Sequence, residues 1–154
     1  MGIEVDAIYT PTGWWTLSGS LGWLDAEYKD FVADLIGTGT PVDNSALELR
    51  RAPKFSFSVN SVMEQDIGPG LASLRVNYVW KGYYETLLTN NPFGTIESYG
   101  ILDASINYDW KNYSISVFGR NLTDENYYTH AFAVPLSEAL WNFGVPREPR
   151  VWGV

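Results

Sequence analysis

The sequence has 154 residues, with 18 acidic and 10 basic side chains for a formal net charge of −8, no cysteine and one histidine. This charge argues against a nucleic-acid-binding protein, which would carry a basic surface, and the lack of cysteine excludes disulfide scaffolds and cysteine-ligated zinc sites. Hydrophobic residues make up 45% of the chain, yet charged residues make up only 18%, against a usual share of about 25%. Such a composition is typical of sheet-rich chains and of chains with one face in lipid.

Apolar and polar residues alternate with a period of two in six successive segments, which is the pattern of β-strands whose two faces meet different surroundings. In chain order, the predicted strands cover residues 3–10, 15–23, 55–64, 71–81, 102–110 and 113–117, and a seventh, shorter segment covers 150–154. No segment has the run of about 18 apolar residues that a membrane-spanning helix needs. Strands of a membrane barrel need only about 9–11 residues each, so the sequence remains compatible with a membrane protein.

The connections between these strands alternate between short and long. Tight turns are predicted at 11–13, 67–70 and 110–112, and long connections at 28–52, 83–97 and 121–147. Outer-membrane barrels have short turns at one end and long loops at the other, whereas a soluble sandwich has no reason to place every long connection at one end. The pattern therefore predicts an all-β, antiparallel transmembrane β-barrel segment.

Aromatic residues gather near the ends of the predicted strands. Trp15 and Trp23 lie on one face eight residues apart, a span of about 26 Å along the strand or about 20 Å of height after tilting. This is close to the separation of the two aromatic girdles of a membrane barrel; the alternative is the ordinary core of a soluble sandwich. The residues that we assign to the girdles are Tyr9, Trp15, Trp23, Trp80, Trp110 and Tyr113.

The number of strands indicates a piece of a larger barrel. Bacterial single-chain barrels close with an even number of strands, whereas this sequence predicts about seven. An open sheet would leave unpaired edges that hydrocarbon does not tolerate. The absence of a signal peptide at Met1 agrees with this expectation.

Several motifs together resemble one family. The most specific is the run Asn121, Leu122, Thr123 and Asp124 followed by Tyr127, which is similar to a C-terminal signature of TonB-dependent outer-membrane receptors. Further similarities to this family lie at 2–4 with 9–11, 24–28, 51–55 and 149–153. Together these motifs span nearly the whole chain in the order that the family has.

The resemblance implies a 22-stranded barrel with an N-terminal plug, of which residues 1–154 would be the C-terminal part, without the plug and the earlier strands. It also implies a place in the outer membrane of a Gram-negative bacterium, in contact with lipid and lipopolysaccharide. The function it implies is the energy-coupled uptake of a scarce solute such as a ferric siderophore, haem, cobalamin or an oligosaccharide. The periplasmic partner TonB would act through the absent plug, and the ligand would be a small molecule or metal chelate.

The sequence predicts no catalytic residue, cofactor or metal site. We expect the residues of the Asn121 motif to be structural, with side chains that hydrogen-bond nearby backbone. Candidate ligand-contact residues are the loop aromatics Tyr83, Tyr84 and Trp141, which offer large rigid surfaces. Basic residues near the rim, namely Arg50, Arg51 and Lys54, could attract an anionic ligand or lipopolysaccharide phosphate, or could only flank the membrane.

Two other classes of protein remain open at this point. One is a complete small outer-membrane barrel that serves as a structural or adhesion module. The other is a barrel hydrolase, in which Asp124, His130 and Ser137 would converge. A closed barrel requires the first and last strands to pair, and a hydrolase requires His130 to lie within reach of a carboxylate and a hydroxyl.

Overall fold

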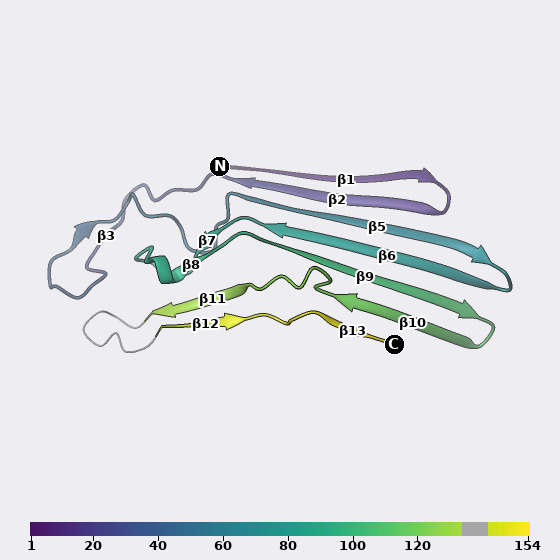
Figure 1. Ribbon diagram of the computed structural model, residues 1–154. Helices are drawn as coiled ribbons and strands as arrows, with labels where there is room; N and C mark the ends of the chain where they lie inside the picture. Colours follow the sequence, from purple (N-terminus) through teal and green to yellow (C-terminus); the bar gives the residue numbers. More distant parts are fainter. Residues whose placement is uncertain (134–141) are drawn as a thin grey trace.

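The computed structural model describes residues 1–133 and 142–154, and its main feature is an antiparallel sheet of seven strands (Figure 1). Their order in the sheet is β1-β2-β5-β6-β9-β10-β13. The bounds are β1 (Gly2–Thr12), β2 (Trp15–Leu24), β5 (Phe55–Ile67), β6 (Gly70–Lys81), β9 (Tyr99–Trp110), β10 (Tyr113–Arg120) and β13 (Val151–Gly153). The prediction of an all-β antiparallel fold is therefore confirmed.

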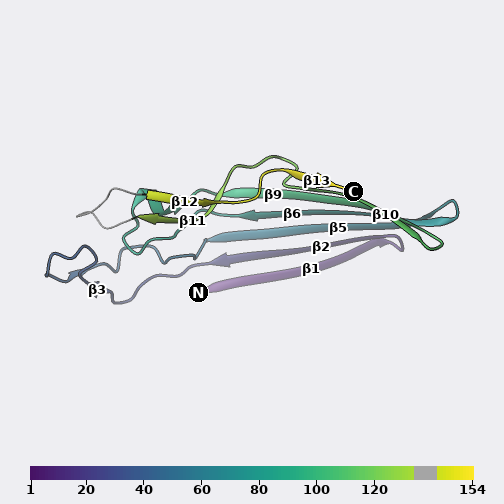
Figure 2. The same ribbon diagram turned by 90° about the horizontal axis from the view of Figure 1, so that it is seen from below.

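The sheet is open. β1 and β13 are its two edges, and Figure 2 shows them at opposite sides of the layer of strands. Within the residues that the structure describes, the first and last strands do not pair with each other, so these seven strands do not close into the complete small barrel that the sequence left open.

The long connections carry small elements that the alternation did not predict. These are the pairs β3 (Val32–Ala33) with β4 (Val42–Asp43), β7 (Tyr84–Glu85) with β8 (Thr95–Ile96) and β11 (Tyr128–Ala133) with β12 (Asn142–Pro146), and the 3-10 helix η1 (Pro92–Gly94). No helix in the described residues is long enough and apolar enough to cross a membrane.

The register of the sheet places residues of like polarity side by side. Side chains of directly paired residues lie on the same face of a sheet, and successive residues alternate between faces. One row across four strands reads Val5, Leu21, Phe57 and Trp80. A row on the opposite face reads Ser18, Asn60, Asn77 and Asp103. The alternation in each strand therefore builds one apolar face and one polar face for the whole sheet.

The described residues leave the apolar face of the sheet uncovered. The buried hydrophobic residues of the described parts are Tyr84, Ile96 and Ala131, which form a small cluster among the long connections; we call it the loop core. Strand residues on the apolar face stay exposed, as Val59 (45%) and Ile106 (56%) illustrate. A soluble sandwich would bury such residues between its two sheets, whereas a membrane barrel turns them toward lipid.

The predicted girdle residues share the apolar face and divide between its two ends. Tyr9, Trp15, Trp110 and Tyr113 lie toward the tight turns, and Trp23 and Trp80 toward the long loops. On β5, Met63 pairs with Trp15 and Phe55 pairs with Trp23, and these two positions are about 26 Å apart along the strand, or about 20 Å in height after tilting. The register thus sets two aromatic rows at a separation that suits the hydrocarbon layer of an outer membrane.

Ser61 is a polar side chain in the middle of the apolar face of β5, paired with Leu17 and Val76. The indole Nε1 of Trp15 donates a hydrogen bond to its Oγ at 3.0 Å. Because lipid offers no hydrogen-bond partners, each of these two polar groups satisfies the other.

Replacing Ser61 with alanine should lower the free energy of unfolding by about 1 kcal/mol, because the indole N–H loses its acceptor. Urea unfolding of the protein in detergent micelles, followed by tryptophan fluorescence, measures this change. Ser114→Ala on the exposed polar face of β10 is the matched control and should change little. Equal losses in the two variants would contradict the role of the Trp15–Ser61 hydrogen bond. In a protein that already carries Trp15→Phe, Ser61→Ala should cause no further loss of stability.

Candidate functional site

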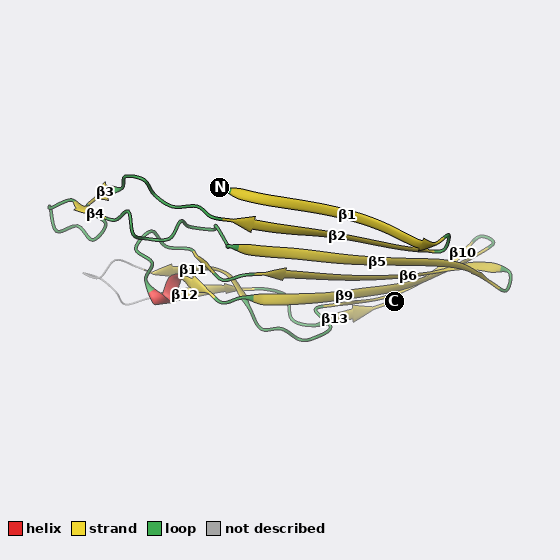
Figure 3. Cartoon of the chain, turned by 90° about the horizontal axis from the view of Figure 1, so that it is seen from above, coloured by secondary structure: helices red, strands yellow, loops and turns green. Residues whose placement is uncertain are grey.

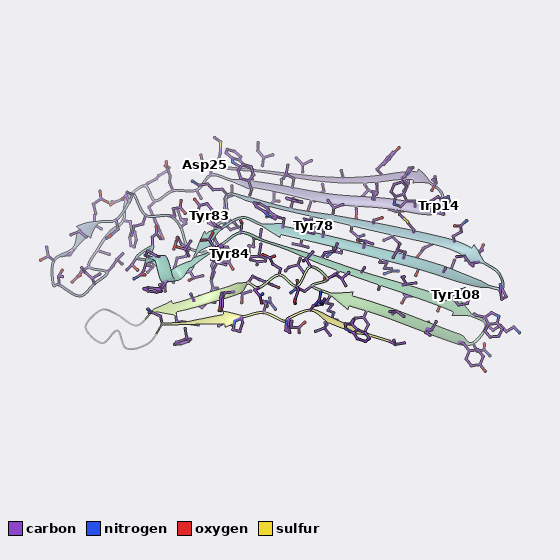
Figure 4. All side chains as sticks on the ribbon, viewed as in Figure 1. Trp14, Asp25, Tyr78, Tyr83, Tyr84 and Tyr108 are labelled. Carbon is purple, nitrogen blue, oxygen red and sulfur yellow. The ribbon has the colours of Figure 1, made fainter. Side chains whose placement is uncertain are left out.

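The three long connections lie at one end of the sheet and the tight turns at the other (Figure 3). We call them the first loop (25–54), the second loop (82–98) and the third loop (121–150). The loop core joins the second loop, which supplies Tyr84 and Ile96, to Ala131 of the third. In Figure 4, Tyr83 and Tyr84 lie at the loop end, whereas Trp14 and Tyr108 lie toward the turns.

Thr86 links the second and third loops. It is 2% exposed, and its hydroxyl lies 2.7 Å from the carbonyl oxygen of Gly94 and 3.2 Å from that of Ala131. Tyr84 strengthens the same contact, because its hydroxyl donates to the carbonyl of Thr129 at 3.0 Å. A buried hydroxyl with backbone partners on two loops holds them in one arrangement.

The first loop is joined to the second by Asn90. Its Nδ2 donates to the carbonyl of Glu48 at 3.1 Å, and its Oδ1 accepts from the backbone N–H of the same residue. The backbone N–H of Arg51 also donates to the carbonyl of Glu85, at 2.8 Å. All three loops are thus connected into one unit.

We expect Thr86→Val to loosen this unit without unfolding the sheet, because the isosteric change removes only the hydroxyl. The loss of about 1 kcal/mol should speed amide hydrogen exchange of 82–98 and 121–133 by roughly five- to tenfold. Hydrogen–deuterium exchange with mass spectrometry measures this, and the exposed Thr89→Val is the control. Unchanged exchange in both segments would show that the hydroxyl does not couple the two loops.

Asn121 lies where β10 enters the third loop and is 3% exposed. Its Nδ2 donates to the carbonyls of Glu125 at 2.9 Å and Glu148 at 3.3 Å, and its Oδ1 accepts from the backbone N–H of Glu125 at 2.8 Å. Its own backbone N–H donates to Asp103 Oδ1 on β9 at 2.9 Å. Asn121 therefore ties both ends of the third loop to the sheet.

The rest of this motif also makes contacts within the third loop and to the sheet. Leu122 donates its backbone N–H to the carbonyl of Leu102 at 2.8 Å, and Asp124 lies 3.6 Å from the guanidinium of Arg150. The ring of Tyr127 stacks on Tyr99 with centroids 4.3 Å apart, and burial raises the pKa of Tyr127. Thr123 is exposed.

The candidate ligand-contact residues have different surroundings. Tyr83 is 42% exposed and donates its hydroxyl to Glu48 at 3.0 Å; this hydrogen bond to a carboxylate raises the pKa of Tyr83. Tyr84 is only 5% exposed, so it offers little surface to a ligand and instead stabilises the loop core. Trp141 lies outside the described residues.

The structure does not bring the hydrolase candidates together within its described part. Asp124 pairs with Arg150, and the polar side chain next to His130 is Arg51, with Nη 3.4 Å from Nδ1. Ser137 lies outside the described residues. Likewise, the described residues contain no cluster of three metal-ligating side chains.

The polar face of the sheet holds charged residues next to an open hollow. Arg75 lies 3.9 Å from Glu64, and Arg120 lies 3.9 Å from Glu148. The hollow has a volume of about 280 Å³ and is lined by Arg75, Asn77, Asp103, Ser105, Phe118 and Arg120 among others. These side chains would face the interior of a barrel built from this sheet.

An antiparallel sheet with one apolar face, aromatic rows at both of its ends and loops gathered at one end defines a transmembrane β-barrel protein. The profile of a family described as TonB dependent receptor-like, beta-barrel, matches residues 1–122. The chain belongs to this family of TonB-dependent receptor β-barrels. Members of the family are outer-membrane receptors and transporters of Gram-negative bacteria, and they bind small ligands such as siderophores and interact with TonB.

Two solved structures have a similar fold. The siderophore receptor PiuA from Acinetobacter baumannii matches with a TM-score of 0.74 at 20% identity, over 97% of this chain and 20% of that one. The ferric yersiniabactin uptake receptor FyuA from Yersinia pestis matches with a TM-score of 0.80 at 16% identity, over 98% of this chain and 22% of that one. The chain thus spans about a fifth of the length of each receptor. No curated protein matches the sequence.

Proposed function

We propose that the protein is an outer-membrane receptor for the uptake of a metal chelate of the siderophore class, with energy supplied through TonB. The observation that carries this proposal is the two-faced sheet, with interlocked loops at one end, in a chain of the TonB-dependent receptor family. The names of the two similar structures, a siderophore receptor and a ferric yersiniabactin uptake receptor, support a chelate as the ligand. We further propose that the aromatic rows contact lipid and lipopolysaccharide at the two membrane surfaces.

Uptake by intact cells tests this proposal. Iron-limited cells that carry the gene should accumulate a ⁵⁵Fe-labelled chelate that cells with the gene deleted do not, and removal of TonB should abolish the difference. Haem, cobalamin and a labelled oligosaccharide serve as alternative solutes. If deletion changes the uptake of none of the four, the protein is not an uptake receptor; if it changes only one of the latter three, the siderophore class is wrong.

A further inference from the structure

The hairpin of β11 and β12 in the third loop has one face that the described residues do not cover. In its register, His130 pairs with Val145 and Phe132 pairs with Phe143, so these four side chains share a face, which we call the hairpin face. Phe132 is 42%, Phe143 55% and Val145 43% exposed. The opposite face carries Ala131, which is buried in the loop core.

The position of the hairpin argues against lipid as the occupant of this face. Tyr127, next to the start of β11, stacks on Tyr99, and Tyr99 pairs with Lys81 and so shares the polar face of the sheet. Lys81 in turn lies over the ring of Tyr84, with Nζ 4.9 Å from the centroid. The residues just before β11 therefore pack over the polar face, beyond the aromatic row at Trp80, where we expect water rather than hydrocarbon as the solvent.

The guanidinium of Arg51 lies next to the hairpin face. Arg51 Nη lies 3.4 Å from His130 Nδ1, the ring of His130 meets Phe132 edge-on at 4.2 Å, and Phe132 stacks on Phe143 at 5.0 Å. Because the guanidinium keeps its protons, it is the donor and Nδ1 is the acceptor, which places the imidazole proton on Nε2. The surface thus offers a positive charge, an N–H donor and two aromatic rings, each beside the next in space.

The backbone holds Arg51 in an uncommon conformation. Its φ is 57°, which costs a non-glycine residue about 1 kcal/mol or more, and its N–H is fixed on the carbonyl of Glu85. Neither Arg50 nor Arg51 lies within ion-pair distance of a carboxylate in the part of the chain that the structure describes. Both line a hollow of about 450 Å³ with Tyr28 and Leu49. In a chain of net charge −8, this places exposed positive charge beside uncovered aromatic rings.

We propose that Arg51 and the hairpin face form a binding subsite for an aromatic group that carries negative charge, such as a phenolate or catecholate arm of a metal chelate. The guanidinium and the Nε2–H of His130 would bind the anionic oxygens, and Phe132 and Phe143 would stack with the ring. This inference rests on the proposed uptake function, because it names the chemical class of the chelate.

Three ferric chelates test the subsite on the whole protein purified from outer membranes. A tripodal tris-catecholate is aromatic and anionic, ferric citrate is anionic without a ring, and a tripodal tris-hydroxamate is neutral without a ring. Equilibrium binding of the ⁵⁵Fe-labelled chelates should give the tightest dissociation constant for the tris-catecholate.

Variants separate the two parts of the subsite. Arg51→Gln should weaken the tris-catecholate and citrate, the former by about tenfold, because a charge-assisted contact is lost. Phe132→Leu, which keeps an apolar side chain and so protects the fold, should weaken the tris-catecholate several-fold and leave citrate unchanged. The matched controls are Lys54→Gln, a rim cation that lies 3.7 Å from Glu48, and Phe55→Leu, a 49% exposed aromatic residue on the apolar face of the sheet.

The outcomes distinguish this inference from the proposed uptake function. If the tris-hydroxamate binds best and is taken up, or if the Arg51 and Phe132 variants behave as their controls do, the subsite is wrong while the uptake function stands. If no ferric chelate binds or enters cells, both fail. Preference for the tris-catecholate together with the two selective losses would support the subsite.

Discussion

Val59→Arg should lower the free energy of unfolding by about 3 kcal/mol, a change of roughly a hundredfold in the folding equilibrium. Val59 lies on the apolar face of β5, between the row of Phe57 and Trp80 and the row of Met63 and Trp15. This is near the middle of the expected hydrocarbon layer, where a guanidinium has neither water nor a counter-ion. Urea unfolding in phospholipid bilayers, followed by tryptophan fluorescence, measures the loss.

The control for this prediction is the adjacent residue on the other face. Asn60 pairs with Ser18 and Asn77 on the polar face, so Asn60→Arg places the same side chain in a hydrated interior. Its unfolding free energy should stay within about 1 kcal/mol of the unsubstituted protein. Equal losses for the two arginine variants would contradict the assignment of the two faces, whereas a loss at Val59 alone would establish which face meets lipid.

Asn121→Ala is expected to cost about 3 kcal/mol, since it removes three side-chain hydrogen bonds from a buried position and leaves the backbone N–H of Glu125 without its acceptor. Part of this cost comes from the backbone, because the φ of Asn121 is 49° and asparagine tolerates this region better than alanine does. Thermal unfolding in detergent, followed by circular dichroism, measures it.

One further variant separates the hydrogen-bond part of this cost from the backbone part, and a second variant is the control. Asn121→Gly accepts the positive φ and should lose only the hydrogen-bond contribution, about 2 kcal/mol. Asn126→Ala, an exposed position in the same loop, should be neutral. If Asn121→Ala is as harmless as Asn126→Ala, the motif does not fix the third loop to the sheet, and its occurrence in this sequence needs a different explanation.

The long strands could be predicted because two-residue periodicity is a local property of the sequence. The boundaries were less exact where the periodicity breaks. The predicted strand starts at residue 102, whereas β9 begins at Tyr99. The prediction is short because Tyr99, Gly100 and Ile101 do not alternate in polarity. Only their pairing with β6, such as Lys81 with Tyr99, includes them in the strand. Val79 also breaks the alternation, because it is an apolar residue on the polar face of β6.

The arrangement of the loops could not be predicted in this way. Tyr83 and Tyr84 are neighbours of the same residue type, yet one is 42% and the other 5% exposed, because the contacts of the loop core decide which one is covered. Strands of two residues such as β7 and β8 have no periodicity to detect. The contact of Arg51 with His130 joins residues 79 positions apart, and nothing near either residue in the sequence indicates the other.

The links that Thr86 and Asn90 make between loops have a consequence for how the loops of such a receptor would change in evolution. A single loop transplanted from a relative would arrive without its partners on the other loops, such as the carbonyls of Ala131 and Glu48. The three loops would therefore be exchanged together, and substitutions in one would favour compensating substitutions in the other two. In this protein, the three loops would then be inherited as one unit rather than as three.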